Sequence, residues 1–127
     1  MATVKKVWNS PEVSIESASL GSATEASPEY STAVDLETAG YAGCQIQIDL
    51  TADADPADTV VVGFFASLDG TVWDDSPFYA IDIGDSDRIL TVLITDVAHF
   101  KVGCWQNNAT DVHSIDIEKM EWRWDAT

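Results

Sequence analysis

Apolar and polar residues alternate with a period of two along most of this chain. From Cys44 to Leu50, cysteine, isoleucine or leucine occupies every second position, and glutamine or aspartate lies between. Successive side chains of a β-strand point to opposite faces, so this pattern predicts a strand with one face in a core and the other in water. No segment shows the spacing of a long amphipathic helix. The chain is therefore predicted to be all-β.

Strand-like segments recur along the chain, separated by connectors rich in Gly, Pro, Asn and Asp. Together with Gly43 to Leu50 they are Val4 to Trp8, Val13 to Leu20, Ser31 to Leu36, Thr59 to Leu68, Phe78 to Ile83, Arg88 to Ile94, His99 to Gln106 and His113 to Trp124. About eight or nine short strands with no helical crossover predict an antiparallel β-sandwich, jelly-roll-like in arrangement. A length of 127 residues fits one domain, residues 1–127.

Two short patterns predict local structure in the connectors. Asp69-Gly70 is a hairpin signal and predicts that Thr59 to Leu68 pairs with 71–73. Thr95 is placed to cap a single helical turn that ends at Ala98.

In the last strand, Ile115 and Ile117 share one phase, whereas Met120, Trp122 and Trp124 share the other. A bulge near Glu118-Lys119 would bring both sets to one face.

The N-terminal part, residues 1–35, has a different composition from the rest. Ser14 to Thr32 contains six serines and two threonines. Such a segment is either a strand followed by a long surface loop, or an extended arm that becomes ordered against a neighbouring subunit.

The charge balance excludes several classes of partner. Six Lys and Arg against 22 Asp and Glu give a formal charge of −16. Such a surface repels nucleic acid and anionic membranes, and only Lys5 and Lys6 adjoin. Carboxylates on the polar phase of strands, such as Asp49, Asp116 and Glu118, are expected to protect sheet edges from unwanted pairing.

The chain shows neither a membrane span nor a secretory signal. Its longest apolar run, Val60 to Ala66, is too short to cross a bilayer, and the start MATVKKVWNSPEV lacks an apolar core. Folding in a reducing host cytoplasm is expected, with Cys44 and Cys104 as free buried thiols; a disulfide between them is the alternative.

No motif for nucleophilic, phosphate-binding or zinc chemistry occurs, which predicts a protein without enzymatic activity and without a cofactor. Two connectors carry groups of carboxylates whose oxygens are suited to calcium. They are Asp53, Asp55 and Asp58 in one connector, and Asp82, Asp85 and Asp87 in the other. Neither matches a known calcium loop, and solvated turns explain them equally well.

Tryptophans near the two ends of the chain are the best candidates for a contact surface. Trp122 and Trp124 share a face of the final strand, with Arg123 opposite, and Trp8 lies near the other end. Trp and Arg are enriched at binding hot spots. Closure of the core by a terminal strand is the alternative, and Trp73 and Trp105 are expected at the core or its rim.

The central part of the sequence resembles a known type of protein. IQIDL (46–50), VVVGFFASLDGTVWDDSP (60–77) and HFKVG (99–103), followed by a closing alternating strand, are similar to small β-sandwich virion proteins of tailed bacterial and archaeal viruses. The resemblance covers roughly residues 41–120, and its most recognisable part is S-x-D-G-x-x-W-D (67–74). It implies a capsid decoration or cement protein, or a tail or head–tail component.

The expectation is therefore a virion structural protein on the capsid surface. Its partners would be the major capsid protein or other virion proteins, and it would form a homo-oligomer, with a trimer as one form. A carbohydrate-binding or receptor-binding β-sandwich module is the alternative. Docking onto an acidic shell should improve as salt screens repulsion. If salt weakens it instead, the basic residues to test first are Lys5, Lys6, Arg88 and Arg123.

Overall fold

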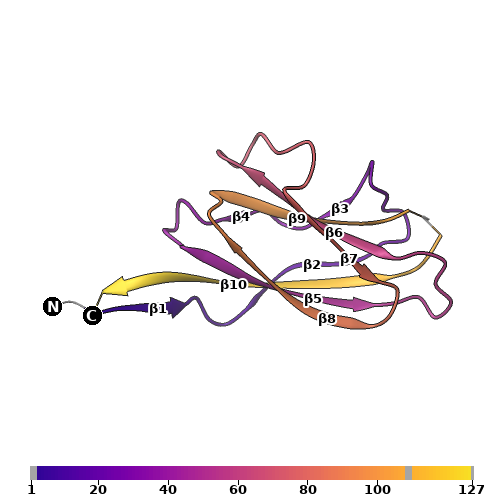
Figure 1. The fold of residues 1–127 in the computed structure, drawn as a ribbon, viewed down its shortest axis with the longest axis horizontal. Helices are drawn as coiled ribbons and strands as arrows, with labels where there is room; N and C mark the ends of the chain where they lie inside the picture. Colours follow the sequence, from indigo (N-terminus) through magenta and orange to yellow (C-terminus); the bar gives the residue numbers. More distant parts are fainter. Residues whose placement is uncertain (1–2, 108–109, 127) are drawn as a thin grey trace.

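Two antiparallel sheets packed face to face form the protein (Figure 1). The computed structural model describes residues 3–107 and 110–126. Sheet A contains β1 (Val4–Trp8), β2 (Val13–Ser19), β5 (Gly43–Thr51), β8 (Arg88–Thr95) and β10 (Ser114–Ala126). Sheet B contains β3 (Glu29–Tyr30), β4 (Val34–Asp35), β6 (Val60–Ser67), β7 (Tyr79–Gly84) and β9 (His99–Gln106). The predicted all-β sandwich is confirmed, and the described residues form ten strands rather than eight or nine.

The core lies between β5 and β10 of sheet A and β6 and β9 of sheet B. Alternation decides which side chains of β5 enter it, so Ile46 and Ile48 are fully buried. Strand β6 is covered on both faces over much of its length, and Phe64 there is fully buried, as is Phe100 on β9. Cys44 and Cys104 are free thiols in this core, as expected from the sequence.

Strand β10 pairs with three other strands of sheet A. On one side it pairs with β5, from Ser114 to Trp122. On the other side it pairs first with β2 and then with β1, so these two strands follow one another along the same edge. A break with a cis peptide between Ser10 and Pro11 separates β1 from β2. Beyond Trp122, β10 pairs with β1 alone, and the two strands extend beyond the rest of the sandwich (Figure 1).

The serine-rich N-terminal segment packs on its own chain. Leu20 is fully buried, Ala23 is 4% exposed, and the amide of Leu20 donates to the carbonyl of His113. The amide of Thr32 also donates to the carbonyl of Ile15. These contacts favour a surface loop over an arm that needs a neighbour. The strand predicted from Ser31 to Leu36 is reduced to the two residues of β4.

One predicted local structure is confirmed only in part, and another is wrong. The predicted return of 71–73 onto β6 follows a tight turn at Asp69, but it is limited to an isolated antiparallel bridge between Ser67 and Trp73. The main partner of β6 on that side is β7. The helical turn after Thr95 does not form, since Asp96 has a φ of 64° and reverses the chain direction at once.

The predicted bulge in β10 is also wrong. β10 keeps a continuous register with β5, so Trp122 and Trp124 face away from the core that Ile117 enters. The register shift lies in the pairing with β2, where Ile15 is the additional residue. No helix long and apolar enough to span a membrane occurs in the part of the chain that the structure describes.

Candidate functional site

The end of sheet A forms a two-stranded extension that we call the terminal ribbon, residues 4–8 and 122–126. In its register Trp8 lies opposite Trp122, and Lys6 opposite Trp124. Because paired residues in an antiparallel ladder point to the same side, these four side chains share one face, the tryptophan face. Trp124 is 57% exposed and Trp8 is 36% exposed. A large aromatic surface is thus presented to solvent.

Lys6 lies at the centre of the tryptophan face. Its Nζ atom is 4.2 Å from the centroid of the Trp122 ring, 5.5 Å from Trp8 and 5.9 Å from Trp124. The rings of Trp122 and Trp124 pack edge to face at 5.0 Å. An ammonium group over aromatic faces is a cation–π contact, which stabilises the arrangement of the rings.

Gly43 fixes the innermost ring of the tryptophan face. This residue lies opposite Trp122, and a Cβ atom there would be 2.5 Å from the indole Nε1. Only glycine leaves room for the indole to lie across β5 at this point. The ring is therefore held where sheet A narrows to the terminal ribbon.

Positive charge is concentrated on the terminal ribbon. It carries Lys5, Lys6 and Arg123, three of the six cations, and one carboxylate, Asp125. Three positive charges and one negative charge give the ribbon a formal charge of +2. Because the whole chain has a formal charge of −16, the rest of the chain carries −18. The molecule is strongly asymmetric in charge, and the sequence-predicted interface residues all lie at its positive end.

The inner face of β10 carries an ion pair where apolar residues would be expected. Glu121 is 4% exposed and accepts a 2.7 Å hydrogen bond from Lys119 Nζ, while its Oε1 has no partner. Cys44 lies opposite Glu121, and burial, with a smaller contribution from the Glu121 charge, raises its pKa to about 12. This thiol is inert at neutral pH.

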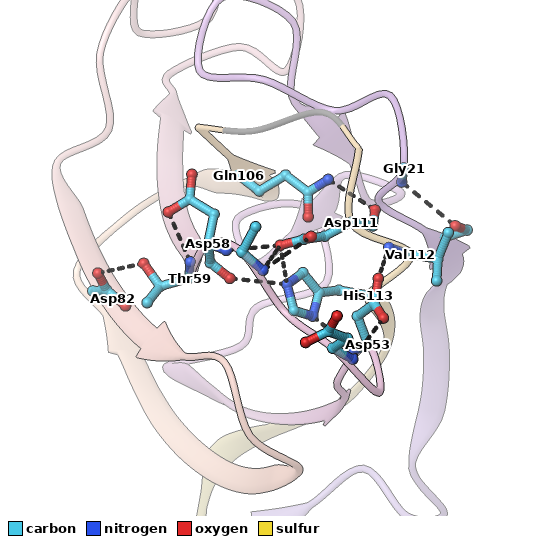
Figure 2. Close-up of polar contacts among 12 residues, drawn as sticks. Gly21, Asp53, Asp58, Thr59, Asp82, Gln106, Asp111, Val112 and His113 are labelled. Atoms are coloured by element: carbon cyan, nitrogen blue, oxygen red, sulfur yellow. Dashed lines mark hydrogen bonds and ion pairs between the residues drawn. The ribbon is translucent and has the colours of Figure 1, made fainter.

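The opposite end of the sandwich holds a buried polar network that the sequence analysis missed. Figure 2 shows the side chains of Asp111 and His113 close together, with His113 between Asp58 and Asp53. Asp111 is 3% exposed, and its carboxylate accepts hydrogen bonds from the amides of Ala57 and Asp58, the latter at 2.8 Å. The Asp111 carboxylate thereby holds the loop against the segment that leads into β10.

His113, which is fully buried, completes this network. Its Nδ1 accepts from the amide of Asp53 at 3.1 Å, whereas its Nε2 donates to the carbonyl of Asp58 and to the Asp111 carboxylate (Figure 2). The hydrogen bonds require the neutral ring with the proton on Nε2. These hydrogen bonds tie the 53–59 loop to the segment that contains Asp111 and His113.

The six calcium candidates do not assemble into one site. Asp53, Asp58, Asp82 and Asp87 accept hydrogen bonds from backbone amides within or between their loops, and Asp55 and Asp85 are exposed. Within residues 3–107 and 110–126, no group of three or more His, Cys, Asp or Glu is placed to hold a metal ion. The candidates are turn-forming residues.

A cleft of about 450 Å³ lies at the same end as the terminal ribbon, between the 66–74 and 96–98 loops. Leu68, Asp69, Trp73 and Asp96 are among its lining residues. Lys101 Nζ lies 4.8 Å from the Trp73 ring centroid and covers part of that ring. As expected, Trp73 packs at the rim of the core and Trp105 is buried.

No protein-family model and no curated protein matches this chain.

Proposed function

We propose that this protein is a non-enzymatic structural protein of a virus particle that decorates the capsid and is held there by its terminal ribbon. The single observation that carries the proposal is the tryptophan face, which presents large aromatic side chains on a projecting part of the molecule. Aromatic anchors of this kind supply most of the energy in protein interfaces. The resemblance of residues 41–120 to virion sandwich proteins supports the same assignment.

The charge distribution supports docking through the ribbon in particular. An acidic body stays soluble at high concentration in the host cytoplasm. The positive ribbon is attracted to an acidic site on a capsid protein, where Trp124 and Trp8 bury their exposed area. Salt is then expected to weaken docking, in contrast to the expectation from net charge alone, because the contacting end is cationic.

Electron cryomicroscopy of the native particle tests the proposed location. The expected result is density for this sandwich on the outer shell, with the terminal ribbon toward the capsid protein. Density at the tail or at the head–tail junction would overturn the capsid assignment. The protein would then be a tail or head–tail component. Absence of the sandwich from the particle, together with binding on a glycan array, would favour the carbohydrate-binding alternative, for which the cleft beside Trp73 is the site.

A further inference from the structure

The two sheets have four edges, and three of them are interrupted. Along one edge of sheet A, β1 and β2 are separated by the Pro11 break, and β2 has an irregular register at Ile15. In sheet B, one edge consists of the two-residue strands β3 and β4. The other is β7, whose register shifts opposite Val60 and which carries Asp82. Short strands, bulges, proline and charge all discourage pairing with another chain.

The fourth edge, β8, has none of these features beyond Arg88 at its start. Its eight residues pair with β5 without a register shift, and no second strand pairs with it among the residues that the structure describes. From Ile89 to Thr95 every residue is β-branched or leucine, and none is charged. Ile89 is 63% exposed and Leu93 is 70% exposed. An edge strand with seven consecutive uncharged residues and a regular register is a template for pairing.

The sequence-based expectation of edge protection is therefore wrong for this edge. Asp49 lies on β5, and Asp116 and Glu118 lie on β10, which are interior strands of sheet A. These carboxylates keep the outer face of the sheet hydrated, but they leave the free backbone groups of β8 uncovered.

We infer that β8 pairs in antiparallel fashion with β8 of a second copy of this chain, about a two-fold axis at Thr91. In this register Ile89 lies opposite Leu93 of the other copy, so each exposed apolar side chain gains a cross-strand partner on the outer face. The contact is self-complementary, as a two-fold interface requires.

The charges next to β8 are compatible with self-pairing. Within one copy, Asp49 lies opposite Ile89, and Gln45 lies opposite Leu93. A row of neighbouring side chains therefore runs across the interface. It passes from Asp49 and Ile89 of one copy to Leu93 and Gln45 of the second copy. No carboxylate faces another in this row, although each copy carries −16. The strand is thus an edge where two acidic copies can meet with little repulsion.

Pairing through β8 fixes the directions in which the two terminal ribbons point. The role that follows for the dimer rests on the proposed function. Thr95 at the end of β8 lies opposite Gly43, and Gly43 lies opposite Trp122 at the base of the terminal ribbon. Because the two β8 strands run in opposite directions, the two ribbons leave the joined sheet at opposite ends. One dimer can then bridge two capsid subunits, which is the task of a cement protein. The dimer itself does not depend on this role.

Sedimentation of the purified full chain tests the pairing. Wild type is expected to show a monomer–dimer equilibrium, and Leu93→Lys to weaken the dimer by about tenfold or more, because two ammonium groups enter the apolar contact. Val72→Lys is the matched control, since Val72 is 73% exposed in the loop after β6. It should leave the dimer unchanged, and thermal melting should show both variants folded.

Cysteine cross-linking tests the register independently. Thr91→Cys should form a disulfide-linked dimer on oxidation, because the two copies of residue 91 face each other across the axis. Thr95→Cys, on the same face of the same strand, should not, since its two copies are about 26 Å apart in this register. The native thiols are buried and do not compete.

Three results would overturn the inference: a monomer at all concentrations, a dimer that Leu93→Lys leaves intact, or equal cross-linking at positions 91 and 95. A dimer that is lost in Trp124→Ala but not in Leu93→Lys would show that the terminal ribbon is a self-contact. That result would count against the proposed capsid docking as well. Loss of capsid binding with an intact Leu93-dependent dimer would instead remove the proposed function alone.

Discussion

Lys6 and Trp122 meet across the terminal ribbon, with the lysine Nζ 4.2 Å from the indole centroid. The contact joins the strand nearest the start of the chain to the strand nearest its end. It also holds the rings of the tryptophan face in place, which would reduce the entropy lost if the proposed partner binds there. Lys6 therefore both contributes positive charge to the terminal ribbon and positions its aromatic surface.

The first prediction concerns salt. Docking on the capsid should weaken steadily as NaCl is raised from about 0.05 to about 0.5 M, because screening removes the attraction between the ribbon cations and an acidic site. Lys5→Gln should reduce this salt dependence, since Lys5 is a ribbon cation outside the tryptophan face. Arg88→Gln is the control, because Arg88 lies at the start of β8 and not on the ribbon. A larger effect of Arg88→Gln than of Lys5→Gln would contradict the assignment.

The second prediction concerns the network around Asp111. Asp111→Asn should lower the free energy of unfolding by about 2 kcal/mol, because an amide cannot accept from the Ala57 and Asp58 amides and from His113 at once. Chemical denaturation measures the loss. Asp85→Asn removes the same charge from an exposed loop and should leave stability within about 0.5 kcal/mol. Equal effects of the two changes would show that the network is not structural.

The third prediction concerns pH. Hydrogen bonds from the amides of Val112 and Asp55 hold the pKa of Asp53 below its ordinary value. A carboxyl with a lowered pKa in the folded state stabilises the fold at pH values above the unfolded-state pKa, and this stabilisation is lost as pH falls through the folded-state pKa. Asp53→Asn should therefore destabilise the protein at neutral pH, and its difference from wild type should shrink in acid.

Thermal melts across the acidic range measure this difference. Asp55→Asn serves as the control, because it removes one charge from the same loop but leaves the hydrogen bonds to the Asp53 carboxylate in place. A deficit in Asp53→Asn that stayed constant from neutral to strongly acidic pH would argue against a role for its ionised form.

The fourth prediction concerns the ion pair on the inner face of β10. Lys119→Met should cost about 3 kcal/mol of stability, because it leaves the buried Glu121 carboxylate without its cation. The double change Lys119→Met with Glu121→Leu should recover most of this loss, since an apolar pair replaces both charges. Denaturant melts compare the variants. If the double variant were no more stable than Lys119→Met, an unpaired buried charge would not be the cause.

The alternation of apolar residues predicted the sandwich because each strand of the core obeys it, as Ile46 and Ile48 of β5 show. It failed at β10, where the core-facing phase continues as Lys119 and Glu121. A pattern of apolar residues alone cannot identify two charges that are buried as a pair. The sequence therefore suggested a bulge that would bring the tryptophans to the core face, and the pairing of β10 with β5 contains no such bulge. The opposite orientation is what leaves Trp124 exposed to solvent.

The candidate site was predicted only in part. Trp8, Trp122 and Trp124 were identified as contact residues from their type and spacing, and the pairing of β1 with β10 brings them together. His113 and Asp111 were missed because their partners are backbone amides of a loop more than 50 positions away in the sequence. Pairings over such distances leave no local signal. The unprotected edge at β8 likewise depends on strand order, which the sequence does not reveal.

Binding of the purified protein to capsids that lack it tests the central claim most directly. Trp124→Ala should weaken binding by about 2 kcal/mol, or about thirtyfold in Kd, with little change in melting temperature, because the ring is an exposed anchor. Val72→Ala, which removes an exposed apolar side chain outside the ribbon, should bind as wild type. Wild-type affinity in Trp124→Ala would contradict docking through the tryptophan face.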